Sequence, residues 1–352
     1  MKPKFILSKQ VVLSQFNKVN QLANIISYSS KTNPLITPIL EEETNSMFSI
    51  HMINELQNVK DASRVLFLAQ AWDEELIKNL INQNVTSFVV DNESDLNMLL
   101  KFLETSKAKI NLLLRLKLRE NTLRTERYFV FGMKAEVINK KILEIVANKN
   151  IKDNIHHLGI HFHRKTQNMA EWNYEYELQH AIKPEVLNKI SIINMGGGLP
   201  SDYANTNVNV ITSIFNKIKE FKAFLNGKNI KLMIEPGRFI SAPAMKLQTQ
   251  IIGMHDNNII VNASVYNSDM DALIVPVKLL VEGELSKEQV KENNEIEPYV
   301  IKGITPCSMD LFRYRVYLDN PKIGDTLTFL NAGAYNFTTE FCDLDIIETV
   351  IE

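Results

Sequence analysis

The chain has 352 residues, of which 45% are hydrophobic, and its 39 basic and 41 acidic residues give a formal net charge of −2. This composition allows a large buried core, excludes a small folded fragment, and lacks the basic excess typical of proteins that bind bulk nucleic acid. Cys307 and Cys342 are too few for a disulfide framework, and no window approaches the ~18 apolar residues of a membrane span, so we expect a soluble, cytoplasmic protein.

Eight short apolar or β-branched runs are the predicted strands of a first domain. They cover residues 25–30, 47–50, 65–69, 87–91, 110–116, 157–163, 191–196 and 231–237. Stretches with helical periodicity separate most of them, as at 73–83, 93–105 and 135–147. Strands that alternate with helices predict a parallel (β/α)8 barrel, and a doubly wound open sheet is the alternative.

Strand-like runs replace the helical pattern in the last part of the chain. They cover residues 244–254, 258–265, 272–283, 297–303, 325–333 and 344–352, and residues 5–13 could add a strand from the N-terminal end. We therefore predict an α/β barrel over residues 22–244, followed by an all-β, Greek-key-like domain built from residues 1–21 and 245–352.

Reactive groups of a parallel barrel lie at the carboxyl ends of its strands, so the residues that end each predicted strand are the candidates. Lys31 follows the first strand, directly before an Asn-Pro turn, where a depressed pKa would make its amine a nucleophile. A lysine that caps a strand at the surface is the alternative interpretation.

The sixth predicted strand ends in two histidines on one face. Alternation sends His161 and His163 to one side and Phe162 to the other. They could act as acid or base, lie against a planar ring, or only accept structural hydrogen bonds. No nearby Asp, Glu or Cys completes a metal-ligand spacing, so we expect no metal.

The last two predicted strands end in an anion-binding type of loop and in a carboxylate. Gly196, Gly197 and Gly198 let backbone N–H groups approach a phosphate, although a tight turn would use them equally well. Glu235 ends the eighth strand with Arg238 three positions on, and an isolated ion pair is the alternative there.

Five ordered motifs together resemble one family. They are the Lys31 segment YSSKTNP, residues 162–166, the three glycines 196–198, the EPGR of residues 235–238, and the GAY of residues 333–335. With the β domain that follows, the whole chain resembles the fold-type III pyridoxal-phosphate (PLP) decarboxylases, the ornithine and diaminopimelate decarboxylase family. The resemblance implies a PLP-dependent carboxy-lyase that works as a homodimer with shared active sites.

The resemblance also implies roles for single residues. Lys31 would bind PLP covalently, His163 would stack on its ring, and Glu235 would keep the ring nitrogen protonated. That glutamate favours a decarboxylase over the related racemases, which place an arginine there. The remaining implied contacts, to the 5′-phosphate, come from Gly196, Gly197, Gly198, Thr166, Gly237, Arg238 and Tyr335.

The sequence departs from the family where a distal amine of the substrate would bind. The family carries a cysteine followed by an acidic residue in the loop that corresponds to residues 303–310. Here Pro306 stands at the cysteine position and Cys307 at the acidic position. Either Cys307 donates the proton to Cα from this shifted position, or the role of proton donor is lost. Ala263 stands where a second acidic residue is expected. We expect Cys307, Asp310 and Ala263 near the substrate, the first two contributed by the partner subunit. Burying an unpaired ammonium is costly, so the distal end of the substrate is not expected to be a simple free amine.

A basic segment follows the fifth predicted strand. It carries Arg115, Lys117, Arg119, Arg124 and Arg127 against Glu120 and Glu126. A solvated face is one interpretation, and an anionic or nucleotide-linked substrate is the other, as for the decarboxylase module of microcin C maturation, which acts on an aminocarboxypropyl group. A catalytically inactive regulatory protein and an amino-acid racemase of the same fold remain the alternative functions.

Overall fold

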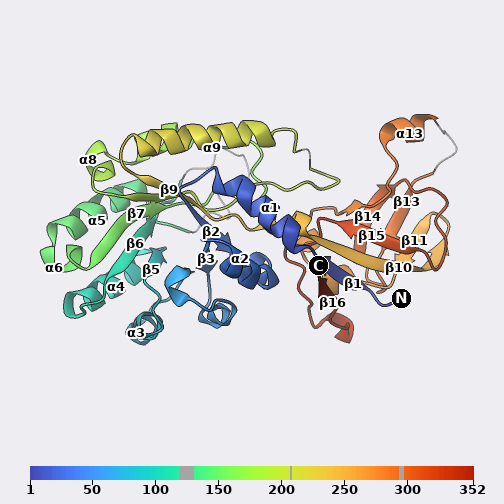
Figure 1. The fold of residues 1–352 in the computed structure, drawn as a ribbon, viewed down its shortest axis with the longest axis horizontal. Coiled ribbons are helices and arrows are strands. Elements are labelled where there is room, and N and C mark those ends of the chain that lie inside the picture. The colour runs from blue at the N-terminus through green and yellow to red at the C-terminus, as the bar shows by residue number, and fades with distance from the viewer. Residues whose placement is uncertain (119–130, 207, 293–296) are drawn as a thin grey trace. The chain divides into compact units, whose positions relative to one another are not determined.

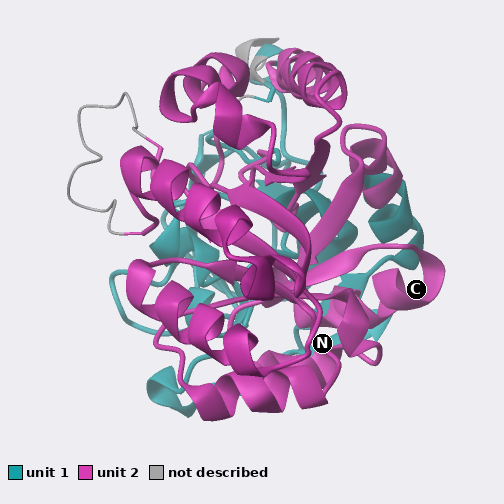
Figure 2. Cartoon of the chain, turned by 90° about the vertical axis from the view of Figure 1, so that its left-hand side faces the viewer, with its two compact units in different colours: residues 1–15, 201–209, 238–352 teal, residues 16–200, 210–237 magenta. Residues whose placement is uncertain are grey.

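The computed structural model describes residues 1–118, 131–206, 208–292 and 297–352. The chain divides into two compact units (Figure 2). The barrel unit consists of residues 16–200 and 210–237, and the β unit consists of residues 1–15, 201–209 and 238–352. No helix in these described ranges is long and apolar enough to cross a membrane.

Eight parallel strands form a closed barrel (Figure 1). They are β2 (Ile25–Ser29), β3 (Met47–Ile50), β4 (Val65–Ala69), β5 (Ser87–Val90), β6 (Ile110–Arg115), β7 (Ile155–His161), β8 (Ile192–Asn194) and β9 (Lys231–Ile234). Each strand pairs with the next, and β2 pairs with β9 to close the ring, with Ile26 opposite Ile234. The predicted barrel is confirmed: seven of the predicted runs contain their strand, and the sixth, 157–163, overlaps β7, which begins two residues earlier at Ile155.

Aliphatic side chains fill the barrel. A buried cluster joins five strands through Leu66, Val89, Leu113, Ile192 and Met233. Such residues make the interior a packed core and not a pore. Polar chemistry is therefore confined to the residues that follow the strands.

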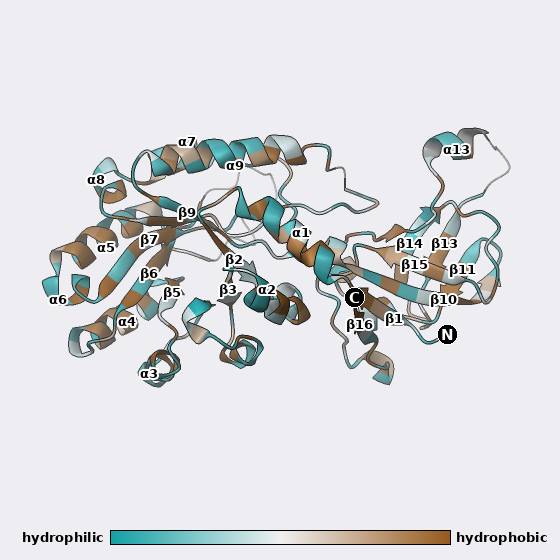
Figure 3. Ribbon diagram, in the orientation of Figure 1, coloured by the Kyte–Doolittle hydropathy of each residue, from teal (hydrophilic) through white to brown (hydrophobic). Residues whose placement is uncertain are grey.

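Helices alternate with these strands in the sequence. They are α1 (Lys9–Asn20), α2 (Thr37–Glu43), α3 (Glu74–Asn82), α4 (Glu93–Thr105), α5 (Ala135–Ala147), α6 (Lys149–Lys152), α7 (Tyr174–Ala181), α8 (Pro184–Leu187) and α9 (Ile211–Asn226). Three of them begin at side-chain caps. Asp73 accepts a hydrogen bond from the Leu76 N–H at 2.7 Å, Asn92 accepts one from the Asp95 N–H at 2.9 Å, and Asn148 accepts one from the Asn150 N–H at 3.2 Å. Figure 3 shows hydrophilic and hydrophobic residues mixed along α9, as expected for a helix with one buried face.

The β unit holds an eight-stranded sheet. Its strands are β1 (Lys4–Leu7), β10 (Met245–His255), β11 (Asn258–Val261), β12 (Leu280–Val281), β13 (Tyr299–Lys302), β14 (Leu311–Val316), β15 (Thr326–Leu330) and β16 (Glu348–Ile351). Their order is β12-β15-β10-β11-β13-β14, and β1 pairs with both β10 and β16. Short helices α10 (Arg238–Ser241), α11 (Val265–Ser268), α12 (Asp271–Ile274) and α13 (Lys287–Glu292) complete it.

Three segments differ from the pattern expected of them. Residues 5–13 supply β1 only up to Leu7, and α1 begins at Lys9. The apolar run 272–283 begins inside α12 and reaches a strand only at β12. Strand β14 was not predicted because Arg313 interrupts its apolar pattern; Arg313 is buried, and its guanidinium is bound by the Leu279 carbonyl and the Glu284 carboxylate.

Candidate active site

Lys31 follows β2 in a short helical turn, η1 (Ser30–Thr32), that neighbouring side chains hold in place. The Ser30 and Thr37 hydroxyls are 2.8 Å apart, and the buried Tyr28 hydroxyl donates to the Asn33 carbonyl at 2.9 Å. Burial lowers the pKa of Lys31, and Glu235 is the negative charge that opposes this most strongly. The residue nevertheless keeps exposed surface.

Glu235 follows β9 and is almost fully buried. Its Oε1 atom accepts a hydrogen bond from Asn194 Nδ2 at 2.7 Å, and Oε2 lies 3.6 Å from His161 Nε2. Burial raises the pKa of this carboxyl, but His161 and Asn194 outweigh it and bring the pKa to about 2. Glu235 is therefore an ionised, fixed carboxylate at neutral pH.

The three glycines after β8 pack closely against the segment after β7. Gly196 and Gly198 have φ values of +69° and +102°, which side chains other than glycine rarely adopt. A Cβ on Gly196 would come within 2.7 Å of the Phe162 carbonyl oxygen. The Gly198 carbonyl also accepts a hydrogen bond from the Asn168 N–H at 2.9 Å. Only glycine allows this close approach.

Both histidines of the sixth predicted strand belong to this end of the barrel. Burial lowers the pKa of His163 to about 4, and its Nδ1 atom accepts a hydrogen bond from the Gly197 N–H at 3.3 Å. Burial also lowers the pKa of His161, against the effect of Glu235. Phe162 packs away from them on Tyr174, with ring centroids 5.0 Å apart. Both imidazoles are thus neutral at physiological pH.

These residues fit a planar, anionic, aldehyde-bearing cofactor. Lys31 offers an amine of lowered pKa, and Glu235 supplies a fixed carboxylate that could face a ring nitrogen. The N–H groups of Gly196 and Gly197 donate to Asn194 Oδ1 at 2.9 Å and to His163 Nδ1 at 3.3 Å, so a phosphate would have to compete with these bonds. Both ring nitrogens of His161 are buried and lack a hydrogen-bond partner within the described part of the chain. Across the same described ranges, no group of three or more His, Cys, Asp or Glu residues could hold a metal ion.

The profile of a known family, described as "Pyridoxal-dependent decarboxylase, pyridoxal binding domain", matches residues 11–242. The chain belongs to the pyridoxal-dependent decarboxylase family. PLP is accordingly its cofactor, and its activity is that of a carboxy-lyase acting on an amino acid.

Relatives and solved structures agree with this assignment. A probable ornithine decarboxylase of Dictyostelium discoideum is 22% identical over 366 residues, which cover 95% of this chain and 76% of that protein. The lysine/ornithine decarboxylase of Vibrio vulnificus, solved with cadaverine, has the same fold with a TM-score of 0.78, 20% identity, and coverage of 99% of this chain and 94% of that one. The arginine decarboxylase of Paramecium bursaria Chlorella virus gives a TM-score of 0.78 at 20% identity, covering 100% and 96% of the two chains.

The other expected phosphate ligands of the decarboxylase lie in different surroundings. Thr166 is exposed, in the segment after β7, and Gly237 packs against the Thr32 hydroxyl, where any side chain would clash. Arg238 is buried in the β unit, forms an ion pair with Asp271, and lies over the Tyr335 ring at 5.4 Å. Phosphate binding by these residues stays a prediction.

The residues expected near the substrate lie in the β unit. Cys307 Sγ is 3.2 Å from the Tyr266 hydroxyl, an interaction that lowers the pKa of the thiol. Asp310 is buried and accepts three hydrogen bonds: from the Val265 N–H at 2.9 Å, the Thr305 N–H at 3.0 Å and the Thr305 hydroxyl at 2.7 Å. Ala263 is fully buried. The Asp310 carboxylate is therefore already committed to holding its own loop.

Sequence reasoning overlooked three residues of the barrel site. Two of them stand at strand ends: Asn194 orients Glu235, and His51 directly follows β3. The rule that found Lys31 could have found both. Glu55 binds the N–H groups of His51 and Met52, each at 2.9 Å, and no strand-end rule indicates it.

The basic segment is only partly described. Arg115 forms an ion pair with Asp91 at 2.9 Å and lies over the Phe131 ring at 4.9 Å, while Lys117 is exposed. The charge of Arg115 is thus paired with the Asp91 carboxylate. The other members of the segment, Arg119, Glu120, Arg124, Glu126 and Arg127, lie outside the described residues.

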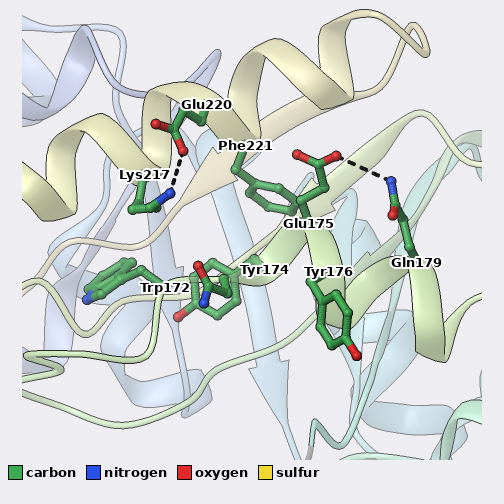
Figure 4. Close-up of a pocket in the computed structure, with 9 residues that line it drawn as sticks. Trp172, Tyr174, Glu175, Tyr176, Gln179, Lys217, Glu220 and Phe221 are labelled. Atoms are coloured by element: carbon green, nitrogen blue, oxygen red, sulfur yellow. Dashed lines mark hydrogen bonds and ion pairs between the residues drawn. The ribbon is translucent and has the colours of Figure 1, made fainter.

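A separate pocket of about 280 Å³ lies on the helices of the barrel unit (Figure 4). Its walls come from α7, from α9 and from the segment before α7. The aromatic part consists of Trp172, Tyr174, Tyr176 and Phe221. The Lys217 ammonium and Glu220 carboxylate pair at its edge at 2.8 Å. Because Lys31 and Glu235 follow barrel strands instead, this pocket is a different feature from the cofactor site.

Proposed function

We propose that the chain decarboxylates an amino acid, or an aminocarboxypropyl group, whose distal end is not a simple free amine. The observation that carries this proposal is the position of Asp310. Both of its oxygens already accept hydrogen bonds from Val265 and Thr305, and Ala263 offers no charge. A buried ammonium at the distal end of a substrate would lack the carboxylate partners it needs.

In this proposal the barrel unit supplies the groups that hold PLP. Lys31 would provide the amine that binds the cofactor, the imidazole of His163 would lie against its ring, and the loop of Gly196–Gly198 would hold its phosphate in exchange for its present hydrogen bonds to Asn194 and His163. PLP supplies the electron sink that accepts the electron pair left at Cα when CO2 departs. Thr166, Gly237, Arg238 and Tyr335 are proposed as further phosphate contacts.

The fixed charge of Glu235 supports decarboxylation rather than racemisation. A carboxylate with a pKa of about 2 stays ionised and can keep the ring nitrogen protonated, which strengthens the electron sink. Asn194 holds this carboxylate in one orientation. An arginine at this position would instead weaken the sink.

Cys307 is the proposed proton donor to Cα. Its lowered pKa and its partly open position beside Tyr266 support a thiol that gives up its proton more readily than an ordinary cysteine. We further propose a homodimer in which Cys307 and its loop serve the active site of the partner subunit. Full activity in a demonstrably monomeric sample would contradict that arrangement.

A CO2-release screen tests the proposed substrate class. It should compare ornithine, lysine and diaminopimelate with amino acids that carry an anionic or nucleotide-linked distal group. We expect turnover only in the second set. The relatives include enzymes named for ornithine and for lysine and ornithine, so efficient turnover of either diamino acid would refute the proposal. Bound cofactor without CO2 release from any compound would instead support an inactive regulatory protein.

A further inference from the structure

His51 lies at the carboxyl end of β3, beside the turn that carries Lys31. Strands β2 and β3 pair in register up to Ser29 and Ser49, and η1 contacts both β3 and the turn η3 (Ile53–Asn58) that follows. The His51 side chain is half-buried, and its Nδ1 atom is buried without a hydrogen-bond partner among the residues described. An unpaired polar atom in the interior is costly, so its presence needs an explanation.

The backbone of His51 is held firmly although it lies outside a strand. One carboxylate oxygen of Glu55 accepts hydrogen bonds from the N–H groups of His51 and Met52, each at 2.9 Å. The Glu55 N–H in turn donates to the Met52 carbonyl at 3.0 Å. The imidazole is therefore presented from a fixed turn and not from a loose loop.

Charged and titratable groups from four other elements influence the pKa of His51 through their charges. Lys31 comes from η1, Arg115 from β6, His161 from β7, and Glu235 follows β9. Burial and then the Lys31 charge lower the pKa of His51 to about 3, with Glu235 opposing them. The imidazole is thus neutral while Lys31 is charged, and it becomes more basic once that charge is lost.

We propose that His51 exchanges one proton with Lys31. When the amine becomes uncharged, an Nζ–H bond of Lys31 breaks and an Nδ1–H bond of His51 forms, directly or through one water; the reverse transfer restores the ammonium. The exchange conserves charge and needs no other reactant. It rests on the proposed role of Lys31, whose amine must be uncharged to bond to the cofactor.

Titration of His51 in the full chain, followed by NMR of labelled histidine rings, tests the coupling without any measurement of activity. Lys31→Met removes the charge and keeps a side chain of similar length, and we expect it to raise the His51 pKa by about one unit or more. Lys78→Met, at an exposed lysine paired with Glu74, is the control and should leave that pKa unchanged. An unchanged pKa in Lys31→Met would overturn the proposal.

The holoenzyme gives a second test. Glutamine can hydrogen-bond but cannot carry the proton, so His51→Gln should shift the pH midpoint of the visible absorbance of bound cofactor by about one unit. A midpoint equal to that of the wild type would contradict the exchange, and if the variant does not fold, the Lys31→Met titration decides. Cofactor that stays covalently bound to Lys31→Met after borohydride reduction would refute the Lys31 assignment instead, so the two failures are distinguishable.

Discussion

Two charges that follow barrel strands and two buried arginines of the β unit have different surroundings. In the barrel unit, Glu235 accepts a hydrogen bond from the neutral Asn194 amide and lies 3.6 Å from a His161 nitrogen that has no hydrogen-bond partner within the described residues, and Lys31 keeps exposed surface. In the β unit, Asp271 binds the terminal nitrogens of Arg238 and Glu284 binds those of Arg313, although the Arg238 Nε atom has no hydrogen-bond partner in the described part of the chain. Charges that retain unused atoms are suited to bind a ligand, whereas closed pairs mainly maintain one packing arrangement.

Lys31→Ala should show most clearly how a charge that binds a ligand differs from a charge in a closed ion pair. The variant loses the cofactor-binding amine, so we expect CO2 release to fall by about 10³-fold or more, with loss of the visible absorbance of bound PLP. The free energy of unfolding should change little, because within the described ranges the Lys31 amine forms no ion pair. A visible band that persists in the variant would count against the assignment.

Asp271→Ala should show the opposite pattern. It leaves the buried guanidinium of Arg238 without its carboxylate, so the free energy of unfolding measured in urea should fall by about 3–5 kcal/mol. Removal of the neighbouring charge also lowers the pKa of the buried Asp269, which burial and Asp271 raise. Lys246→Ala, which breaks the exposed pair with Glu282, is the matched control, with an expected loss of about 1 kcal/mol at most. Equal losses of unfolding free energy in the two variants would show that the buried pair stabilises the fold no more than the exposed pair.

Tyr266→Phe should have the smallest effect. The Tyr266 hydroxyl is the largest cause of the lowered Cys307 pKa, so its removal raises that pKa and slows alkylation of the thiol near neutral pH. We expect a change of about two- to tenfold in the alkylation rate, read by mass spectrometry, with Cys342 in the same sample as the internal reference. Faster alkylation of Cys307 would show that the hydroxyl protects the thiol instead of activating it.

The barrel could be predicted because each of its strands is a short apolar run, and the strand-end rule led directly to Lys31 and Glu235. The β unit was harder, since Arg313 inside β14 is stabilised by Leu279 and Glu284, which are distant in sequence. His51 also follows a strand, so the same rule could have found it, but a single histidine there carries no motif to draw attention to it. That Asp310 is already bonded to Val265 and Thr305 depends on the tertiary fold, so no sequence pattern indicates it.

The hydrogen bonds of Asp310 have one more consequence, for the energetics of association. They tie the turn that carries Cys307 to the start of α11, so this turn is already ordered in the single chain. A surface that is rigid before contact loses little conformational entropy when another molecule covers it. A molecule that docks on this turn therefore binds a surface that is already ordered, and its binding energy is not spent on ordering the turn.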